Sequence, residues 1–142
     1  MTKRLSANLT KAIACLLFVI SFLWGLAAFP PFDLAARIYL DLLHWPVGDG
    51  LPQWNQETIW LSSIGAGLVC ALAVFYLLIV TPAVRKGDRQ TIKAALIAVI
   101  AWFVVDSIGS YAAGILSNVG FNIITLTLLI TPLLMALAKA EE

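Results

Sequence analysis

The residue with the clearest chemical potential is Asp106, an acidic side chain inside a long apolar stretch. An ionised carboxylate near the middle of a bilayer costs at least about 2.5–3.5 kcal/mol, so it should face protein or water rather than acyl chains. One interpretation makes Asp106 a proton- or ion-handling group on a path through the membrane. The other makes it a hydrogen-bonded carboxyl that ties helices together, and the lack of a second charge in the apolar runs favours it.

Small and polar residues recur near Asp106 at helical spacing, since Gly109, Ser110 and Ala113 follow it on one face. A face of small residues lets a second helix approach closely. Matching the expected depths of the apolar segments then places polar residues of the last segment near the carboxyl. The candidate intramembrane contacts are Asp106, Ser110, Asn122 and Thr127.

A second polar set, Asp33, Arg37, Asp41 and His44, is spaced by four, four and three residues. On a helix these side chains fall within about 80° of arc, and the rest of 33–45 is mostly apolar. This segment is too short to cross a bilayer, so it predicts an amphipathic helix on the membrane surface. Arg37 can bridge both aspartates in a solvated row. Asp41 and His44 alone are too few ligands for a metal, and we expect none.

The elements that must position these residues are apolar helices, because 61% of the 142 residues are hydrophobic and only 12% are charged. Soluble domains average about 45–50% apolar and about 25% charged residues. A span needs about 20 residues. The sequence therefore predicts an all-α, polytopic membrane protein, a four-transmembrane-helix bundle forming one membrane domain over residues 1–142. The expected spans are about 12–30, 59–80, 92–116 and 120–138, with the interfacial helix at about 33–45.

Breaker residues set the expected ends of these spans. Pro30 and Pro31 should end the first, Thr81-Pro82 should close the second, and Asp88 is placed to cap the third. The last apolar stretch, 94–138, would be about 68 Å long as a single helix and must fold back. Its turn-like tetrad Ser117-Asn118-Val119-Gly120 is the expected reversal point.

The first apolar segment has an alternative interpretation as a signal peptide, because it combines a basic start with the small-residue triplet Leu26-Ala27-Ala28. Its apolar stretch exceeds the usual 7–15 residues, which favours a retained span. Eight of the nine Lys and Arg residues lie on one side of the four expected spans, whereas Arg37 alone lies on the other. The positive-inside rule therefore predicts cytoplasmic N and C termini.

The second span carries small residues at four-residue spacing in two registers, Ser62-Ala66-Cys70 and Ser63-Gly67-Ala71. Such repeats permit close approach of helices, either within one bundle, which we favour, or between subunits. We therefore assign Ser63, Gly67 and Ala71 a helix-packing role.

Three segments resemble small, uncharacterised bacterial inner-membrane proteins with four expected spans: residues 36–46 (ARIYLDLLHWP), 60–65 (WLSSIG) and 102–107 (WFVVDS). The resemblance covers about residues 29–122 and implies the architecture and an inner-membrane location, but no activity. We expect an accessory or structural subunit that acts through helix packing, and not an enzyme. The alternative is a minimal oligomeric transporter or channel that uses Asp106 for protons or cations. The expected partners are the lipid bilayer and a membrane protein or second copy, with no nucleic acid and no cofactor.

Overall fold

The computed structural model describes residues 3–48 and 54–138. Within that part of the chain four helical segments are long and apolar enough to cross a membrane. They extend over Lys3–Ala28, Gln56–Lys86, Arg89–Ala112 and Leu116–Ala138. The expected all-α architecture with four such helices is confirmed; residues 1–2, 49–53 and 139–142 lie outside the described part.

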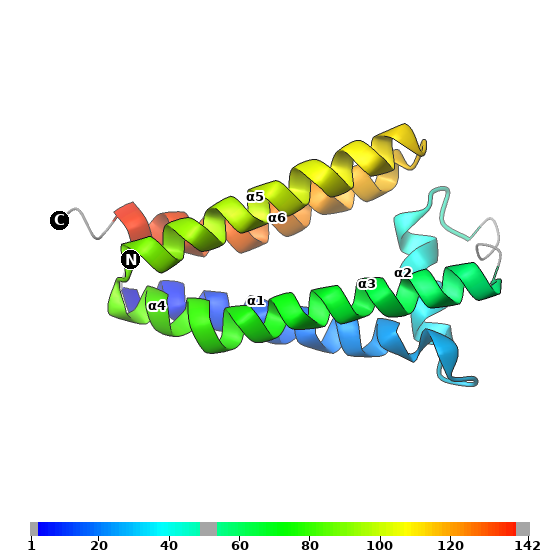
Figure 1. The fold of residues 1–142 in the computed structure, drawn as a ribbon, viewed down its shortest axis with the longest axis horizontal. Helices are drawn as coiled ribbons and strands as arrows, with labels where there is room; N and C mark the ends of the chain where they lie inside the picture. The colour runs from blue at the N-terminus through cyan, green and yellow to red at the C-terminus, as the bar shows by residue number, and fades with distance from the viewer. Residues whose placement is uncertain (1–2, 49–53, 139–142) are drawn as a thin grey trace.

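The long helices form two antiparallel pairs, α1 with α3 and α5 with α6 (Figure 1). The pairs meet mainly through α1 and α6, and they separate toward the end where α2 crosses between them (Figure 1). The elements in chain order are α1 (Lys3–Gly25), the 3-10 turn η1 (Leu26–Ala28), α2 (Leu34–Leu43), α3 (Gln56–Phe75), the π-helical turn η2 (Tyr76–Val80), α4 (Thr81–Lys86), α5 (Arg89–Ala112) and α6 (Leu116–Ala138).

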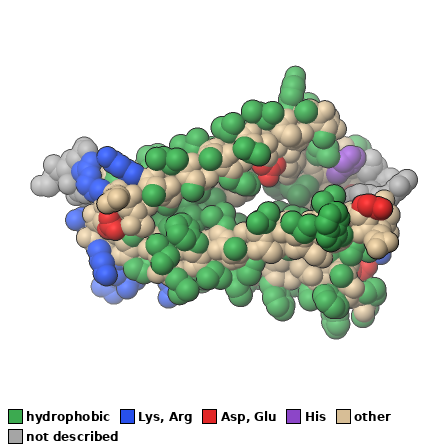
Figure 2. All heavy atoms as spheres, in the orientation of Figure 1, with side chains coloured by type: hydrophobic (Ala, Val, Ile, Leu, Met, Phe, Trp, Pro, Cys, Tyr) green, Lys and Arg blue, Asp and Glu red, His purple; other side chains and the backbone are tan. Residues whose placement is uncertain are grey.

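The apolar core occupies the half of the bundle where both described ends of the chain lie. Alanines on α1 and α5 allow the helices to approach closely, and larger side chains from η2 and α6 fill the centre. The buried members are Ala7, Ala14, Tyr76, Val80, Val84, Ile92, Ala95, Val99, Leu129, Leu133 and Ala136. Lys and Arg side chains gather outside this same end (Figure 2), as the charge bias of the sequence leads one to expect.

The contact between α1 and α3 uses the other register of the small-residue repeat. Ser62 and Ala66 are buried, and a side-chain carbon on Gly25 would meet Ala66 at 3.6 Å. Gly67 and Ala71 are instead exposed, and nothing lies within 4 Å of a side-chain carbon built on Gly67. The Ser63–Gly67–Ala71 face therefore does not mediate the packing within the described chain, which corrects the favoured expectation for these residues.

The second long helix does not close at Thr81-Pro82. Pro82 has no amide hydrogen to continue an α-helical ladder. The chain meets this constraint by winding Tyr76–Val80 as a π-helical turn, in which the amide of Thr81 donates to the carbonyl of Tyr76 five residues back. Pro82 then lies in the first turn of α4, where no amide donor is needed, and the helix continues to Lys86.

The connection from α4 to α5 follows the sequence expectation. Gly87 ends α4 in the left-handed conformation at φ 76°, and Asp88 caps α5. Its Oδ1 accepts from the amides of Gln90 and Thr91 at 3.1 and 3.3 Å. The pKa of Asp88 is lowered from its usual value, first because the Thr91 hydroxyl donates to its carboxylate. The predicted cap is confirmed.

The reversal between the last two helices comes earlier than the tetrad 117–120 indicated. α5 ends at Ala112 rather than near 116, and α6 begins at Leu116 rather than near 120. Gly114 provides the turn at φ 78°, and the amide of Ile115 donates back to the carbonyl of Ser110 at 2.9 Å. A glycine in the left-handed conformation followed by such a bond is a common helix end. The chain therefore reverses at Gly114 and not in the more polar tetrad 117–120.

Gly65 on α3 yields a stability prediction, because a side-chain carbon built there would overlap the ring of Trp24 on α1. We expect Gly65→Ala to destabilise the fold by about 1–3 kcal/mol, since overpacking forces a large ring to move. Gly109→Ala on α5 is the matched control, because nothing lies within 4 Å of a side-chain carbon built there, and it should be neutral or slightly stabilising. Thermal unfolding in mild detergent measures both; equal melting temperatures for the two variants would refute the close packing of Trp24 on Gly65.

Candidate functional site

Asp106 is the centre of a polar cluster between α5 and α6. Its Oδ1 accepts from the Ser110 hydroxyl at 3.1 Å, one turn along the same helix. The side-chain amides of Asn118 and Asn122, both on α6, donate to the same oxygen at 3.0 Å each. Asp106, Ser107, Ser110, Asn118 and Asn122 together are called the Asp106 cluster below.

The members of the cluster are also bonded to one another. The Asn118 amide donates to the Ser110 hydroxyl at 2.7 Å, and the Asn122 amide donates to the Ser107 hydroxyl at 3.3 Å. Asn118 and Asn122 are four residues apart, so α6 presents both amides on one face. Four bonds therefore join α6 to α5 near their shared turn, in addition to the apolar contact between these helices.

The early turn explains why these residues meet. Because α5 ends at Ala112, Asp106 lies six residues from its end, a rise of about 9 Å, and is nearer the α2 end of the bundle than the sequence suggested. Because α6 begins at Leu116, Asn118 already belongs to its first turn. The reversal at Gly114 then brings the first turns of α6 beside the last turns of α5.

The cluster compensates the cost of placing a carboxyl in an apolar helix pair. Polar groups removed from water are costly unless they are hydrogen-bonded, and bonds to a charged acceptor are about twice as strong as neutral ones. Asn122 is 5% exposed, whereas Asp106, Ser110 and Asn118 are half-buried. The carboxyl is thus tied to protein donors on one oxygen while it keeps some access to its surroundings.

The α2 helix approaches the Asp106 cluster from the open end of the bundle. The hydroxyl of Ser117 at the start of α6 donates to the carbonyl of Leu43, and the amide of Trp45 donates back to that hydroxyl at 3.4 Å. The ring of Tyr39 on α2 packs against that of Trp24 on α1 in a tilted arrangement, with centroids 5.0 Å apart and an interplanar angle of 50°. Through these contacts α2 joins the two helix pairs where they separate.

Tyr39 also reports the charge of the cluster. Burial raises the pKa of the Tyr39 phenol above its usual value, and the negative charge of Asp106 raises it further. Both causes disfavour a phenolate, because its charge would be desolvated and would repel the carboxylate. Tyr39 therefore remains a neutral side chain beside the cluster at physiological pH.

The polar residues of α2 only partly form the expected solvated row. Asp33 is 9% exposed, and Arg37 pairs with it at 2.8 Å. Asp33 occupies the position before α2 but makes no side-chain cap: its backbone is helical at φ −67°, whereas capping residues are typically extended, and its Oδ2 accepts from Arg37. The expected second bridge is replaced by another contact: the Asp41 carboxylate accepts from the Gly48 amide at 3.1 Å.

The remaining residues of that set have separate surroundings. The guanidinium of Arg37 lies 4.6 Å from the ring centre of Trp54, which adds a cation–π contact to its ion pair. His44 is exposed after the last turn of α2. Among the described residues no group of three or more His, Cys, Asp or Glu side chains is arranged to hold a metal ion.

Two of the three predicted partners join Asp106, and the third does not. Ser110 and Asn122 contact the carboxylate. Thr127 is exposed one turn further along α6, and its hydroxyl donates to the carbonyl of Ile123 at 2.8 Å. Asn118 and Ser107 were missed. The spacing of Asn118 and Asn122 would have indicated a shared face, had the turn been placed at Gly114.

Comparison with known proteins adds no relative: no protein-family model, curated protein or solved structure matches this chain.

The electrostatic effect of Asp106 on Tyr39 predicts a change in the pKa of the Tyr39 phenol when the carboxyl is removed. We expect Asp106→Asn to lower the pKa of Tyr39 relative to the unchanged protein, while burial keeps it above its usual value. The folded protein holds the phenolic proton more tightly than the unfolded chain does. The contribution of Tyr39 to stability is therefore fully present below the ordinary tyrosine pKa and is lost as pH rises through the folded value. Because the folded pKa is higher with Asp106 than with Asn at that position, the loss extends to higher pH and is larger in total in the unchanged protein.

Ultraviolet absorbance of the phenolate measures this titration, and the Tyr39→Phe variant identifies which part of the signal belongs to Tyr39. A Tyr39 titration that is the same with Asp106 and with Asn at that position would contradict the electrostatic contact.

Proposed function

We propose that this chain is a small integral membrane protein that acts as an accessory or structural subunit through helix packing. The observation that supports it is the uncovered Ser63–Gly67–Ala71 face of α3. Gly67 and Ala71 are exposed, while α1 occupies the neighbouring register of the same helix. Its proposed partner is a transmembrane helix of a second copy or of another membrane protein.

In a bilayer, a face of small residues favours the association of helices. Lipid tails are as apolar as leucine, so helices associate through close van der Waals contact and hydrogen bonds rather than through burial of apolar area. A side-chain carbon on Gly67 would meet nothing within 4 Å, so a neighbouring backbone can come close there. The half-buried hydroxyl of Ser63 bonds to the carbonyl of Ile59 at 3.0 Å and adds no steric barrier.

We propose a bacterial inner membrane with both termini in the cytoplasm as the setting. The gathering of Lys and Arg at the end where α1 begins and α6 ends supports this orientation (Figure 2), because cytoplasmic flanks are enriched in these residues. The exposed apolar side chains of α2, Leu34, Ile38 and Leu42, lie at four-residue spacing and suit contact with the opposite membrane surface.

The packing proposal predicts that Gly67→Leu weakens association by about tenfold, because a bulky side chain opens the close contact. Gly109→Leu on α5 is the matched control, since Gly109 is exposed and equally without neighbours. A photo-crosslinking residue at Ala71 in native membranes measures adduct formation, and sedimentation in mild detergent measures self-association. A monomer that forms no adduct at Ala71, or equal effects of both leucines, would refute the proposal.

A second candidate function, a minimal proton- or cation-coupled transporter or channel, is supported by the environment of Asp106. The carboxyl is half-buried, and its described hydrogen bonds all reach Oδ1. The space-filling view has a hollow between the α5/α6 pair and the α3 side of the bundle (Figure 2). Ionisable residues in membrane segments often mark ion paths.

The transport candidate predicts that Asp106→Asn abolishes proton or cation flux in vesicles loaded with an ion-sensitive dye, whereas Asp106→Glu retains part of it. Ser107→Ala is the control that alters the cluster without removing the carboxyl. No flux above protein-free vesicles for the unchanged chain, or full flux in Asp106→Asn, would eliminate this candidate and leave the packing role.

A further inference from the structure

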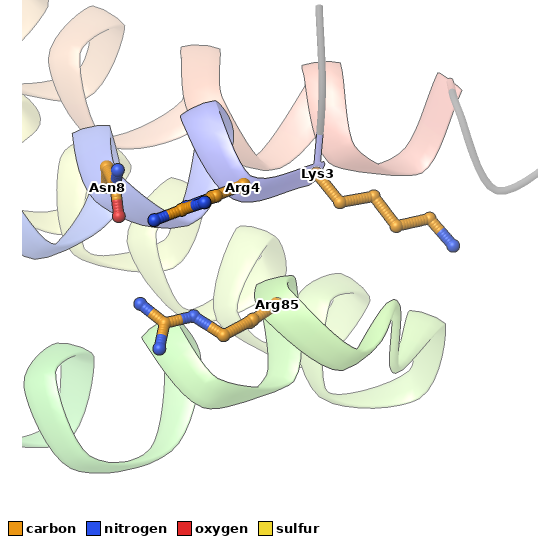
Figure 3. A pocket seen from close by; sticks show the side chains of 4 residues that line it. All are labelled: Lys3, Arg4, Asn8 and Arg85. Carbon is orange, nitrogen blue, oxygen red and sulfur yellow. The ribbon is translucent and has the colours of Figure 1, made fainter.

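Two basic grooves adjoin one another between α1 and the α4 end of the second long helix. The larger, with a volume of about 570 Å³, is lined by Lys3, Arg4, Asn8 and Arg85. In Figure 3 the side chains of Arg4 and Arg85 extend toward the same side as Asn8, whereas Lys3 extends the opposite way. Two guanidinium groups from different helices therefore border one opening.

The smaller groove, about 260 Å³, shares Arg85 with the first and combines cations with apolar walls. Its other lining residues are Lys11, Leu77, Thr81, Pro82 and Lys86. An apolar wall beside a ring of cations is the surface expected where acyl chains give way to headgroups.

The cations of both grooves lack a matching set of acids in the described chain. The ion pair found among the described residues joins Arg37 to Asp33, at the opposite end of the bundle. Asp88 is a described acid whose pKa is affected by a groove residue, since the charge of Lys86 contributes to lowering it. Asp88 forms no ion pair with Arg4, Lys11 or Arg85 among the described residues.

Thr81 lines the smaller groove, but its hydroxyl oxygen is buried and has no hydrogen-bond partner among the described residues. Thr81 is 5% exposed, and its hydroxyl makes no hydrogen bond in the described structure. Hydroxyls elsewhere bond to the carbonyl one turn back, as Thr10 does to Ser6 at 2.9 Å and Thr131 does to Thr127 at 2.6 Å. Thr81 follows the π-helical turn, which changes the register of the carbonyls behind it.

We propose that these two grooves form a binding site for the phosphate of an anionic phospholipid headgroup. Arg85 and its neighbours Arg4, Lys11 and Lys86 supply the charge. Guanidinium groups bind phosphate oxygens in a bidentate geometry, which favours arginine at such a site. Leu77 and Pro82 contact the glycerol and the first carbons of the acyl chains. A lipid is the favoured source because the second apolar helix ends at this groove.

The experiment counts bound phosphatidylglycerol and phosphatidylcholine on the full chain by native mass spectrometry from mixed-lipid nanodiscs. It is run at about 0.15 M ionic strength, where charges beyond about 8 Å are screened. We expect phosphatidylglycerol to be retained over phosphatidylcholine, and Arg85→Gln to weaken its binding by about tenfold. Lys93→Gln is the matched control, because it removes one exposed charge from α5 without lining either groove, and should change binding by less than about twofold.

Arg4→Gln tests the second guanidinium group, because Arg4 lines the larger groove from α1. We expect it to weaken headgroup binding by about fivefold. Equal retention of the two lipids, equal effects of Arg85→Gln and Lys93→Gln, or unchanged binding in Arg4→Gln would overturn the proposal. Inorganic phosphate is titrated as a separate arm; displacement of the lipid at equal concentration would identify a soluble anion as the ligand and refute the lipid assignment.

Discussion

The need of one carboxyl for hydrogen-bond donors organises the second half of this molecule. Asp106 lies in an apolar helix, so its position is stable only where donors reach it. Ser110 supplies one from the same helix, and Asn118 and Asn122 supply two from α6. These bonds fix how α6 is rotated and how far it is shifted along α5. Ser117, on the adjoining turn, then holds the end of α2.

The coarse architecture could be predicted from the sequence because hydropathy and charge placement act over twenty residues at a time. The prediction of four apolar helices and a short amphipathic segment depends on the average composition of each segment, which no single residue changes much. The Asp88 cap was also predictable, since a cap depends on neighbours within one turn. Whether the helices lie in a bilayer, and which way they face, stays a prediction.

The details that escaped sequence analysis depend on competition between local signals or on packing partners. Ser117-Asn118-Val119-Gly120 is rich in turn residues, yet Gly114 reverses the chain and releases Asn118 to reach Asp106. Two small-residue registers on α3 look alike in sequence, and only the placement of α1 selects Ser62 and Ala66 for contact. Pro82 predicted a helix end, but the π-helical turn Tyr76–Val80 precedes it and the helix continues through Pro82 to Lys86.

The π-helical turn η2 has a consequence for how the chain tolerates changes in length. It holds one residue more than an α-helical turn, so everything beyond it is advanced by about 100° around the helix axis. A deletion of one residue between Tyr76 and Val80 would restore an unbroken ladder up to Pro82 and swing α4 away from α1. Because Leu77 of this turn lines the same groove as Lys11 and Arg85, a change in length here would move Arg85 relative to α1 even though no charged residue was altered.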